Sequence, residues 1–241
     1  FDLGDVALPH ANNNERCIED ITKFFERIAK EKKPVVSIGG DHSITGGILQ
    51  GLGRNNLELT NGKKISFLHI DAHTDTFSQL DHFMGAKKSA AHWGAYLVEQ
   101  GIIDPKTSMQ IGMRGNPRTL DWLQPSYDLG YNVVTMDEFK KRGIQNVIEE
   151  TLEKIGDNPV YITFDLDSLD ASVAPAVSNI EPSFTGFTID EAKALIQSVK
   201  NKNVIGGDVV CLMPTKDQKN NITAMVAASI MFEIISVISY K

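Results

Sequence analysis

The fold of this 241-residue chain can be predicted outward from residues 65–75, which read ISFLHIDAHTD. The first part, Ile65–Ile70, is a short and mostly apolar run that is typical of a buried β-strand. The run changes abruptly into a polar cluster at residues 71–75, DAHTD. In sheets of parallel strands, binding sites form at the carboxyl ends of the strands. We therefore interpret this stretch as a strand that delivers functional side chains to one edge of a sheet.

The same change from an apolar run to a polar cluster occurs at two other places. Val35–Ile38 leads into GGDHS at residues 39–43, and Val160–Phe164 leads into DLDSLD at residues 165–170. A single Asp-His pair after a strand is usually a loop or a helix cap. Three such clusters, each at the end of a predicted strand, point instead to one shared site.

Apolar runs and amphipathic stretches alternate along the whole chain, which predicts βαβ units and a mainly parallel sheet. The strands are nearly continuous apolar runs, as expected where helices cover both faces of a sheet. We predict an α/β fold, a single three-layer α/β/α domain over residues 1–241. The predicted strands are Val35–Ile38, Ile65–Ile70, Ser108–Ile111, Asn132–Thr135, Val160–Phe164 and Val204–Leu212. The predicted helices are Ser43–Leu52, Ala90–Gln100, Ile144–Ile155, Ile189–Ser198 and Ile222–Val237.

Composition indicates a globular protein and excludes some classes of partner. Hydrophobic residues make up 41% and charged residues 23%, near the averages for globular domains. The net charge of -7 argues against nucleic acid or an anionic membrane as a partner, and suits metal ions or a cationic substrate. No apolar run approaches the roughly 20 residues of a membrane span.

The cysteines and the first residues bear on the compartment. Cys17 and Cys211 are too few for a disulfide framework, which favours a reducing compartment. We expect a cytoplasmic protein, with a mitochondrial location left open. The chain begins at Phe1 and reads like the middle of a protein, so we expect residues upstream to be missing.

The spacing of the polar residues predicts a metal site. Residues two apart in an extended chain point to the same side, so Asp71, His73 and Asp75 converge, as do Asp165 and Asp167. Uncompensated carboxylates this close would repel one another, and a cation is their natural partner. Oxygen and imidazole ligands without thiolate suit Mn²⁺, with Fe²⁺, Ni²⁺ and Zn²⁺ as alternatives. With His42 there are six ligands, enough for two bridged ions.

At this point the sequence resembles a known family. The clusters at residues 39–43, 71–75 and 164–170 resemble the three signatures of the ureohydrolases, the arginase and agmatinase family, in the family's order. The similarity continues through QIGMRG at residues 110–115 and GDVV at residues 207–210, and covers essentially the whole chain. The resemblance implies that the family's amino-terminal portion is missing from this sequence. The pattern is nearest to agmatinase and guanidinobutyrase.

The resemblance implies an arginase-like metallohydrolase domain with two divalent ions, Mn²⁺ or Ni²⁺. It assigns one ion to His42, Asp71, Asp75 and Asp165, and the other to His73, Asp71, Asp165 and Asp167. The implied reaction is attack of metal-bound hydroxide on a small guanidino or amidino compound, releasing urea and an amine. Asp75 would orient the hydroxide. The family also implies a homo-oligomer, a trimer or a hexamer.

Three departures from the family pattern concern the substrate and the proton. The family's histidine after the second signature is replaced by Ala90, and His92 is a candidate substitute. We weigh this against an ordinary core or surface histidine, which we favour. The loop that frames the substrate contains Asn179 and Glu181, and Cys211 stands where a carboxylate normally pairs with the guanidinium.

These departures leave two classes of function open. The first is an active amidinohydrolase with an altered pocket, and the second is a catalytically silent paralogue that binds metal and regulates an active subunit. A faint similarity to formimidoylglutamase at residues 174–178 adds an alternative substrate class. An enzyme with a Cys211 nucleophile is disfavoured, because no Cys-His pairing is visible in the sequence.

Overall fold

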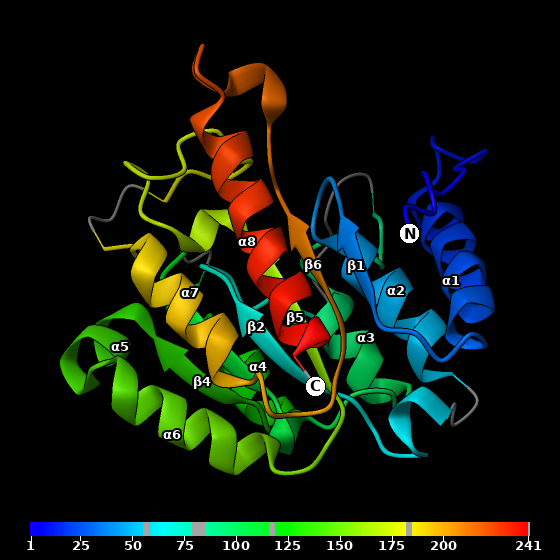
Figure 1. The fold of residues 1–241 in the computed structure, drawn as a ribbon, viewed down its shortest axis with the longest axis horizontal. Coiled ribbons are helices and arrows are strands. Elements are labelled where there is room, and N and C mark those ends of the chain that lie inside the picture. The colour runs from blue at the N-terminus through cyan, green and yellow to red at the C-terminus, as the bar shows by residue number, and fades with distance from the viewer. Residues whose placement is uncertain (55–57, 79–84, 116–118, 182–184, 241) are drawn as a thin grey trace.

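The computed structural model describes residues 1–54, 58–78, 85–115, 119–181 and 185–240. These residues contain a six-stranded sheet in the order β1-β6-β5-β2-β3-β4, in which every pair of neighbouring strands is parallel (Figure 1). The strands are β1 Val35–Ile38, β2 Ser66–Ile70, β3 Met109–Met113, β4 Asn132–Thr135, β5 Val160–Asp165 and β6 Val204–Val210. The predicted parallel sheet is confirmed.

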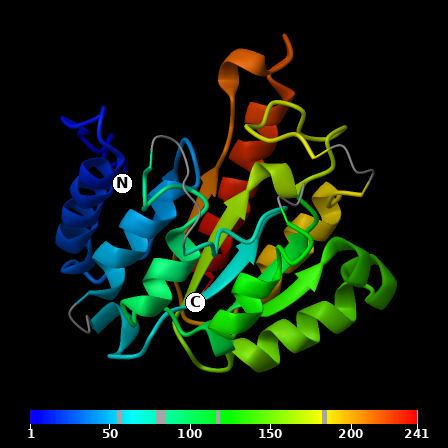
Figure 2. The same cartoon turned by 180° about the vertical axis from the view of Figure 1, so that it is seen from behind.

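Helices cover both faces of this sheet, so the predicted three-layer α/β/α fold is also confirmed (Figures 1 and 2). One face is covered by α1 Asn14–Ala29, α2 Ser43–Gly53 and α3 Trp93–Glu99, with α4 Gln124–Leu129 beside β4. The other face is covered by α5 Met136–Arg142, α6 Ile144–Ile155, α7 Ile189–Ser198 and α8 Ile222–Ser239. Short 3₁₀ turns lie at Glu58–Thr60, Pro105–Thr107, Leu166–Ser168 and Pro214–Lys216.

The central strands contribute alternate side chains to two hydrophobic cores. In β2, Phe67 packs toward α1–α3, while Leu68 and Ile70 pack toward α5–α8. In β5, Tyr161 likewise packs toward α1–α3, and Ile162 packs toward α5–α8. These side chains are fully buried, and each contributes about 1.5–3 kcal/mol to folding through burial of apolar surface. The two cores fix the strands whose carboxyl ends carry the polar clusters.

Helix α1 was not predicted from the sequence. It begins after Asn13, whose side chain accepts a hydrogen bond from the backbone N–H of Arg16 and caps the first turn. Its apolar side packs closely against α2, where a Cβ added to Gly51 would lie 2.6 Å from the Cβ of Phe25. The glycines of α2 therefore allow α1 to approach, a long-range effect that the local pattern of residues 14–29 does not reveal.

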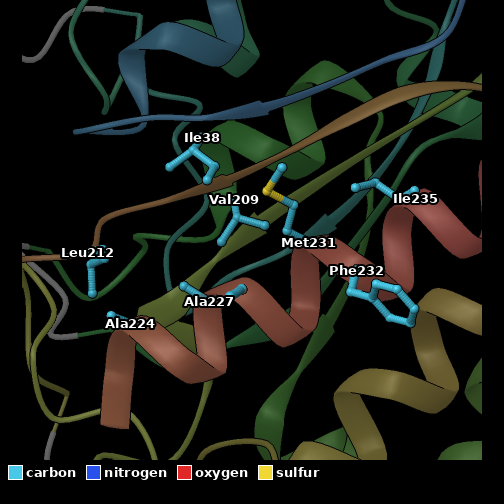
Figure 3. A pocket seen from close by; sticks show the side chains of 9 residues that line it. Ile38, Val209, Leu212, Ala224, Ala227, Met231, Phe232 and Ile235 are labelled. Carbon is cyan, nitrogen blue, oxygen red and sulfur yellow. The ribbon is translucent and has the colours of Figure 1, made fainter. Parts of the chain in front are cut away.

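Helix α8 borders an apolar groove of about 340 Å³ between β1, β6 and the helix (Figure 3). Ile38 and Phe232 on this groove are both more than 60% exposed. The helix has 18 residues and a mean hydropathy of 2.0, so by length and composition it could span a membrane, although one third of it is buried in the fold. The expectation that no apolar run approaches a span is corrected for α8. Core helices pass the same test, and Ile230 and Ile234 of α8 pack into the core.

Candidate metal centre

Three strands, β1, β5 and β2, bring polar side chains to one edge of the sheet at their carboxyl ends. His42 follows β1 at the start of α2, Asp71 follows β2 directly, and Asp165 is the last residue of β5. A cavity of about 1770 Å³ opens above this edge, and it is lined by all the predicted ligands except Asp71, which is fully buried. The three clusters that the sequence singles out therefore meet at one place.

The first group of side chains surrounds His42. Its Nδ1 atom lies 2.9 Å from Asp71 Oδ2, 3.1 Å from Asp75 Oδ2 and 3.2 Å from Asp165 Oδ2. His42 is buried, yet this Nδ1 forms no hydrogen bond within the described part of the chain. This nitrogen and three carboxylate oxygens converge with no hydrogen bond recorded between them, an arrangement that a cation would satisfy.

The second group surrounds His73. Its Nδ1 atom lies 3.2 Å from Asp167 Oδ2 and 3.4 Å from Asp71 Oδ1. Asp167 Oδ2 is buried and, among the residues described, has no hydrogen-bond partner. A Cβ added to Gly115 would lie only 2.4 Å from His73 Cδ2, so the imidazole occupies space that only glycine leaves free.

In both groups the ligand atoms lie close enough together to hold a metal ion. His42, His69, Asp71 and Asp75 form one such group, and Asp71, His73 and Asp167 form the other, with the atoms of each group within 4.8 Å of one another. Asp71 belongs to both, as its predicted bridging position requires. The bridging role predicted for Asp165 remains a prediction, since its contact with a histidine is on the His42 side.

Burial and the close contacts between histidines and carboxylates shift the pKa values of the residues at this site. Burial disfavours a charged imidazole, but contacts with Asp165, Asp71 and Asp75 outweigh it and raise the pKa of His42. The pKa of His73 is raised for the same reason, mainly by Asp167. Burial, together with repulsion from Asp165 and Asp71, raises the pKa of Asp167. Without a metal, protons on the two histidines and the Arg114 guanidinium offset part of this negative charge, and two divalent cations would fit the same donors.

The turn that carries Asp167 is held from two sides. Asp165 Oδ1 accepts a hydrogen bond from the backbone N–H of Asp167 at 2.8 Å. The Arg114 guanidinium donates to the three consecutive carbonyl oxygens of residues 167–169. These contacts orient the Asp165 and Asp167 carboxylates toward the cavity and give Arg114, in the QIGMRG stretch, a structural role.

His69 is a member of the site that sequence reasoning missed. Its Nε2 lies 2.7 Å from Asp71 Oδ2, and its Nδ1 lies 3.2 Å from the side-chain nitrogen of Gln110. An amide nitrogen only donates, so Nδ1 is the acceptor and Nε2–H donates to Asp71. The same two-residue alternation that singles out Asp71, His73 and Asp75 would have included His69 if it had been extended one step back into the strand.

Asp75 is fixed by its backbone and by an indole. It has a left-handed backbone conformation, with φ of 52°, which is uncommon for residues other than glycine. The Trp93 Nε1–H donates a hydrogen bond of 2.9 Å to Asp75 Oδ2, and Trp93 is fully buried at the start of α3. The carboxylate is thus held in one orientation beside His42.

The residues predicted to bind substrate lie at the same cavity. Asn179, Glu181 and Cys211 all line it, and Asn179 is exposed. Glu181 Oε1 lies 2.9 Å from His73 Nε2, a contact that the sequence did not predict. Burial, reinforced by Asp165 and Asp167, raises the pKa of the Cys211 thiol well above its usual value. Cys211 is therefore neutral and does not replace a carboxylate. The roles of these three residues in binding remain predictions.

His92, the predicted substitute for the family's proton-shuttling histidine, is placed less favourably. Ser89, Ala90 and Ala91 line the cavity, whereas His92 is not among the described residues that do so. It is buried at the start of α3, with Nδ1 2.8 Å from the Ser89 hydroxyl. This environment resembles the ordinary core histidine that we favoured, and a catalytic role for His92 remains a prediction.

Comparison with known proteins identifies the family. The model of the arginase family matches residues 1–236. The chain belongs to the arginase family. Its predicted membership of the ureohydrolases is confirmed by relatives such as a mitochondrial guanidino acid hydrolase from Homo sapiens, 32% identical over 97% of this chain and 63% of that protein. An Escherichia coli agmatinase is 32% identical over 100% of this chain and 71% of that protein.

Solved structures of arginase-family proteins have the same architecture. A hypothetical agmatinase from Burkholderia thailandensis superposes with a TM-score of 0.82 at 28% identity, over 99% of this chain and 69% of that one. Proclavaminate amidino hydrolase from Streptomyces clavuligerus also gives a TM-score of 0.82, at 29% identity, over 99% of this chain and 74% of that one. The chain spans just under two thirds of the length of the human relative and of a chicken mitochondrial agmatinase, 63% and 66%.

Proposed function

We propose that this arginase-family chain is a binuclear, metal-dependent amidinohydrolase that cleaves a C–N bond of a small guanidino or amidino compound. The observation that carries the proposal is the pair of ligand groups around His42 and His73, which share Asp71. The proposed ligands are His42, Asp71, Asp75 and Asp165 for one ion, and His73, Asp71, Asp165 and Asp167 for the other. The relatives support the reaction class, since their names describe hydrolysis of agmatine and guanidino acids.

The chemistry of the site is divided between the ions and the protein. When bound, two divalent ions would act as Lewis acids that lower the pKa of water, so that hydroxide is available to attack carbon at neutral pH. Asp75, held by Trp93, is placed to accept a hydrogen bond from the attacking water and orient it. Oxygen and imidazole ligands fit Mn²⁺ or Ni²⁺.

The substrate pocket differs from one designed for a large alkylguanidinium. Burying such a cation without a nearby anion is unfavourable, and the buried Cys211 is neutral. Among the three residues predicted to bind substrate, Glu181 is the anion, but it already contacts His73. We therefore propose a substrate that is smaller or less basic than arginine and agmatine, held by Asn179, Glu181 and Cys211.

The test is to load the purified chain with Mn²⁺ or Ni²⁺ and to measure urea and amine release from a panel of guanidino compounds that differ in size and charge. We expect metal-dependent turnover of at least one small guanidino compound, abolished by a chelator and by Asp71→Ala. A chain that binds no divalent metal would refute the proposal.

A catalytically silent, metal-binding paralogue is the second candidate. The observations that favour it are Ala90 at the cavity and the neutral Cys211, both at positions where the family has functional side chains. Two tightly bound ions without release of product from any member of the panel would establish this alternative. The predicted homo-oligomer, a trimer or a hexamer, and the predicted cytoplasmic location are retained as proposals, to be tested by measuring mass in solution and by fractionating cells.

A further inference from the structure

A buried carboxylate below the metal centre has no part in the function described so far. Asp208 lies in β6, is fully buried and is not among the described residues lining the cavity. Three hydroxyl groups donate to it, from Thr163 to Oδ1 at 2.7 Å, and from Thr45 and Tyr161 to Oδ2 at 2.8 and 2.9 Å. Both of its oxygens therefore act as acceptors, and these hydrogen bonds offset the cost of burying a carboxylate this deeply.

One of these hydroxyls connects Asp208 with a proposed metal ligand. The Thr163 Oγ1 atom lies 2.8 Å from His42 Nε2. Because the Thr163 hydroxyl proton is directed at Asp208, the oxygen accepts a hydrogen bond from His42, so that Nε2 carries a proton. In the neutral imidazole, the form that binds a metal, the lone pair is then on Nδ1, which faces the three carboxylates where a metal would lie.

The second imidazole has an equivalent partner. Glu181 Oε1 lies 2.9 Å from His73 Nε2, on the side of the ring opposite Asp71 and Asp167. A carboxylate behind a metal-binding histidine fixes its tautomer and increases its basicity as a ligand. His73 has this carboxylate in direct contact, whereas His42 reaches one through a hydroxyl.

We propose that Thr163 and Asp208 are positioning residues of the metal centre, and that the chain Asp208–Thr163–His42 holds His42 in the Nε2–H tautomer with Nδ1 facing the ion. This inference rests on the proposed binuclear centre. It predicts that affinity for the ion at His42 depends on a hydroxyl at position 163, beyond any effect of that hydroxyl on folding.

The structure provides a matched control for this idea. Thr163 and Tyr161 each donate one hydrogen bond to the same carboxylate, from the same strand, at 2.7 and 2.9 Å. Thr163→Val and Tyr161→Phe each remove one donor from Asp208 and leave the shape of the side chain nearly unchanged. Of the two hydroxyls, that of Thr163 contacts His42.

The experiment measures Mn²⁺ and Ni²⁺ affinity of the metal-stripped chain by competition with a chelator, together with chemical unfolding of the same metal-free proteins. We expect Thr163→Val to lower the affinity for one of the two ions by about 10–100-fold, the usual effect of removing a partner of a metal-binding histidine. Tyr161→Phe should leave both affinities at the wild-type level, and Thr163→Ser should restore them. Asp208→Asn should weaken the same ion.

The outcomes separate this inference from the proposed function. A wild-type chain that binds two ions, with Thr163→Val and Tyr161→Phe binding both equally well, overturns the positioning role while leaving the metal centre intact. Equal losses of affinity in both variants, matched by equal losses in unfolding free energy, show a purely structural role and also overturn it. A wild-type chain that binds no metal overturns both proposals.

Discussion

Replacing Asp71 with alanine should remove both metal ions from the chain. Asp71 Oδ2 lies 2.9 Å from His42 Nδ1, and Asp71 Oδ1 lies 3.4 Å from His73 Nδ1. The carboxylate therefore lies between the two imidazoles. By contrast, Asp75 contacts the His42 side and Asp167 contacts the His73 side.

The size of the effect can be bounded from these contacts. Removing a partner behind a metal-binding histidine costs about 10–100-fold in affinity, so removing a direct ligand should cost at least about 100-fold. This corresponds to about 2.7 kcal/mol for each ion. Asp71→Ala should lose this binding free energy for both ions, whereas Asp75→Ala and Asp167→Ala should each lose it for one ion.

The assay is metal analysis of purified variants after dialysis against a weak chelator, with thermal unfolding to show that each variant is folded. We expect two ions per chain in the wild type, none in Asp71→Ala, and one each in Asp75→Ala and Asp167→Ala. Two tightly held ions in folded Asp71→Ala would refute the bridging assignment.

Three further predictions concern the surroundings of this centre and the surface. Gly115→Ala should displace the imidazole of His73, because the new Cβ would lie 2.4 Å from its ring, and one of the two ions should be lost in metal analysis. Cys211→Glu should shift substrate preference toward agmatine-like compounds by up to about 3 kcal/mol in transition-state binding, seen in kcat/KM. In the folded chain, burial opposes ionisation of Glu191, but the hydrogen bonds from Lys140 and from the backbone N–H of Thr188 outweigh this effect and lower the pKa of Glu191. The stabilisation of the folded chain by ionised Glu191 is present above the pKa that Glu191 has in the unfolded chain, and it is lost as the pH falls through its pKa in the folded chain. Glu191→Gln should therefore destabilise the chain by about 0.5 kcal/mol at pH 7 and by nothing in acid, measured by urea unfolding.

Each of these predictions has its own control. Gly115→Ala must unfold like the wild type in the absence of metal, since otherwise the loss of an ion reports misfolding. Cys211→Gln introduces a similar shape without charge, and an equal shift of preference in this variant would contradict the electrostatic argument. Lys140→Met should reproduce the effect of Glu191→Gln, and additive losses in the double variant would show that the two residues act independently.

Much of the architecture could be predicted from local patterns in the sequence. Runs such as Val160–Phe164 are strands in the structure at nearly the predicted positions, because fully buried strands of a parallel sheet carry a strong apolar signal. The polar clusters after them were found because they interrupt that signal abruptly. Helix α1 was missed, since its packing depends on the glycines of α2, which lie about 30 residues away in the sequence.

The parts of the site that escaped prediction share one physical origin, the register of the sheet. Asp208 pairs with Thr163, Thr163 pairs with His69, and His69 pairs with Gln110 across four adjacent strands. All four side chains are fully buried. In the sequence each is a single polar residue inside an apolar run, and although Gln110 and Asp208 lie in stretches that resemble the family, the pattern assigns them no role. In the folded sheet they form one polar row directly below the ligands, contacting Asp71 through His69 and His42 through Thr163. Isolated polar residues in otherwise apolar strands thus gain a function only when the strand order brings them into the same row, and that order is decided by tertiary packing.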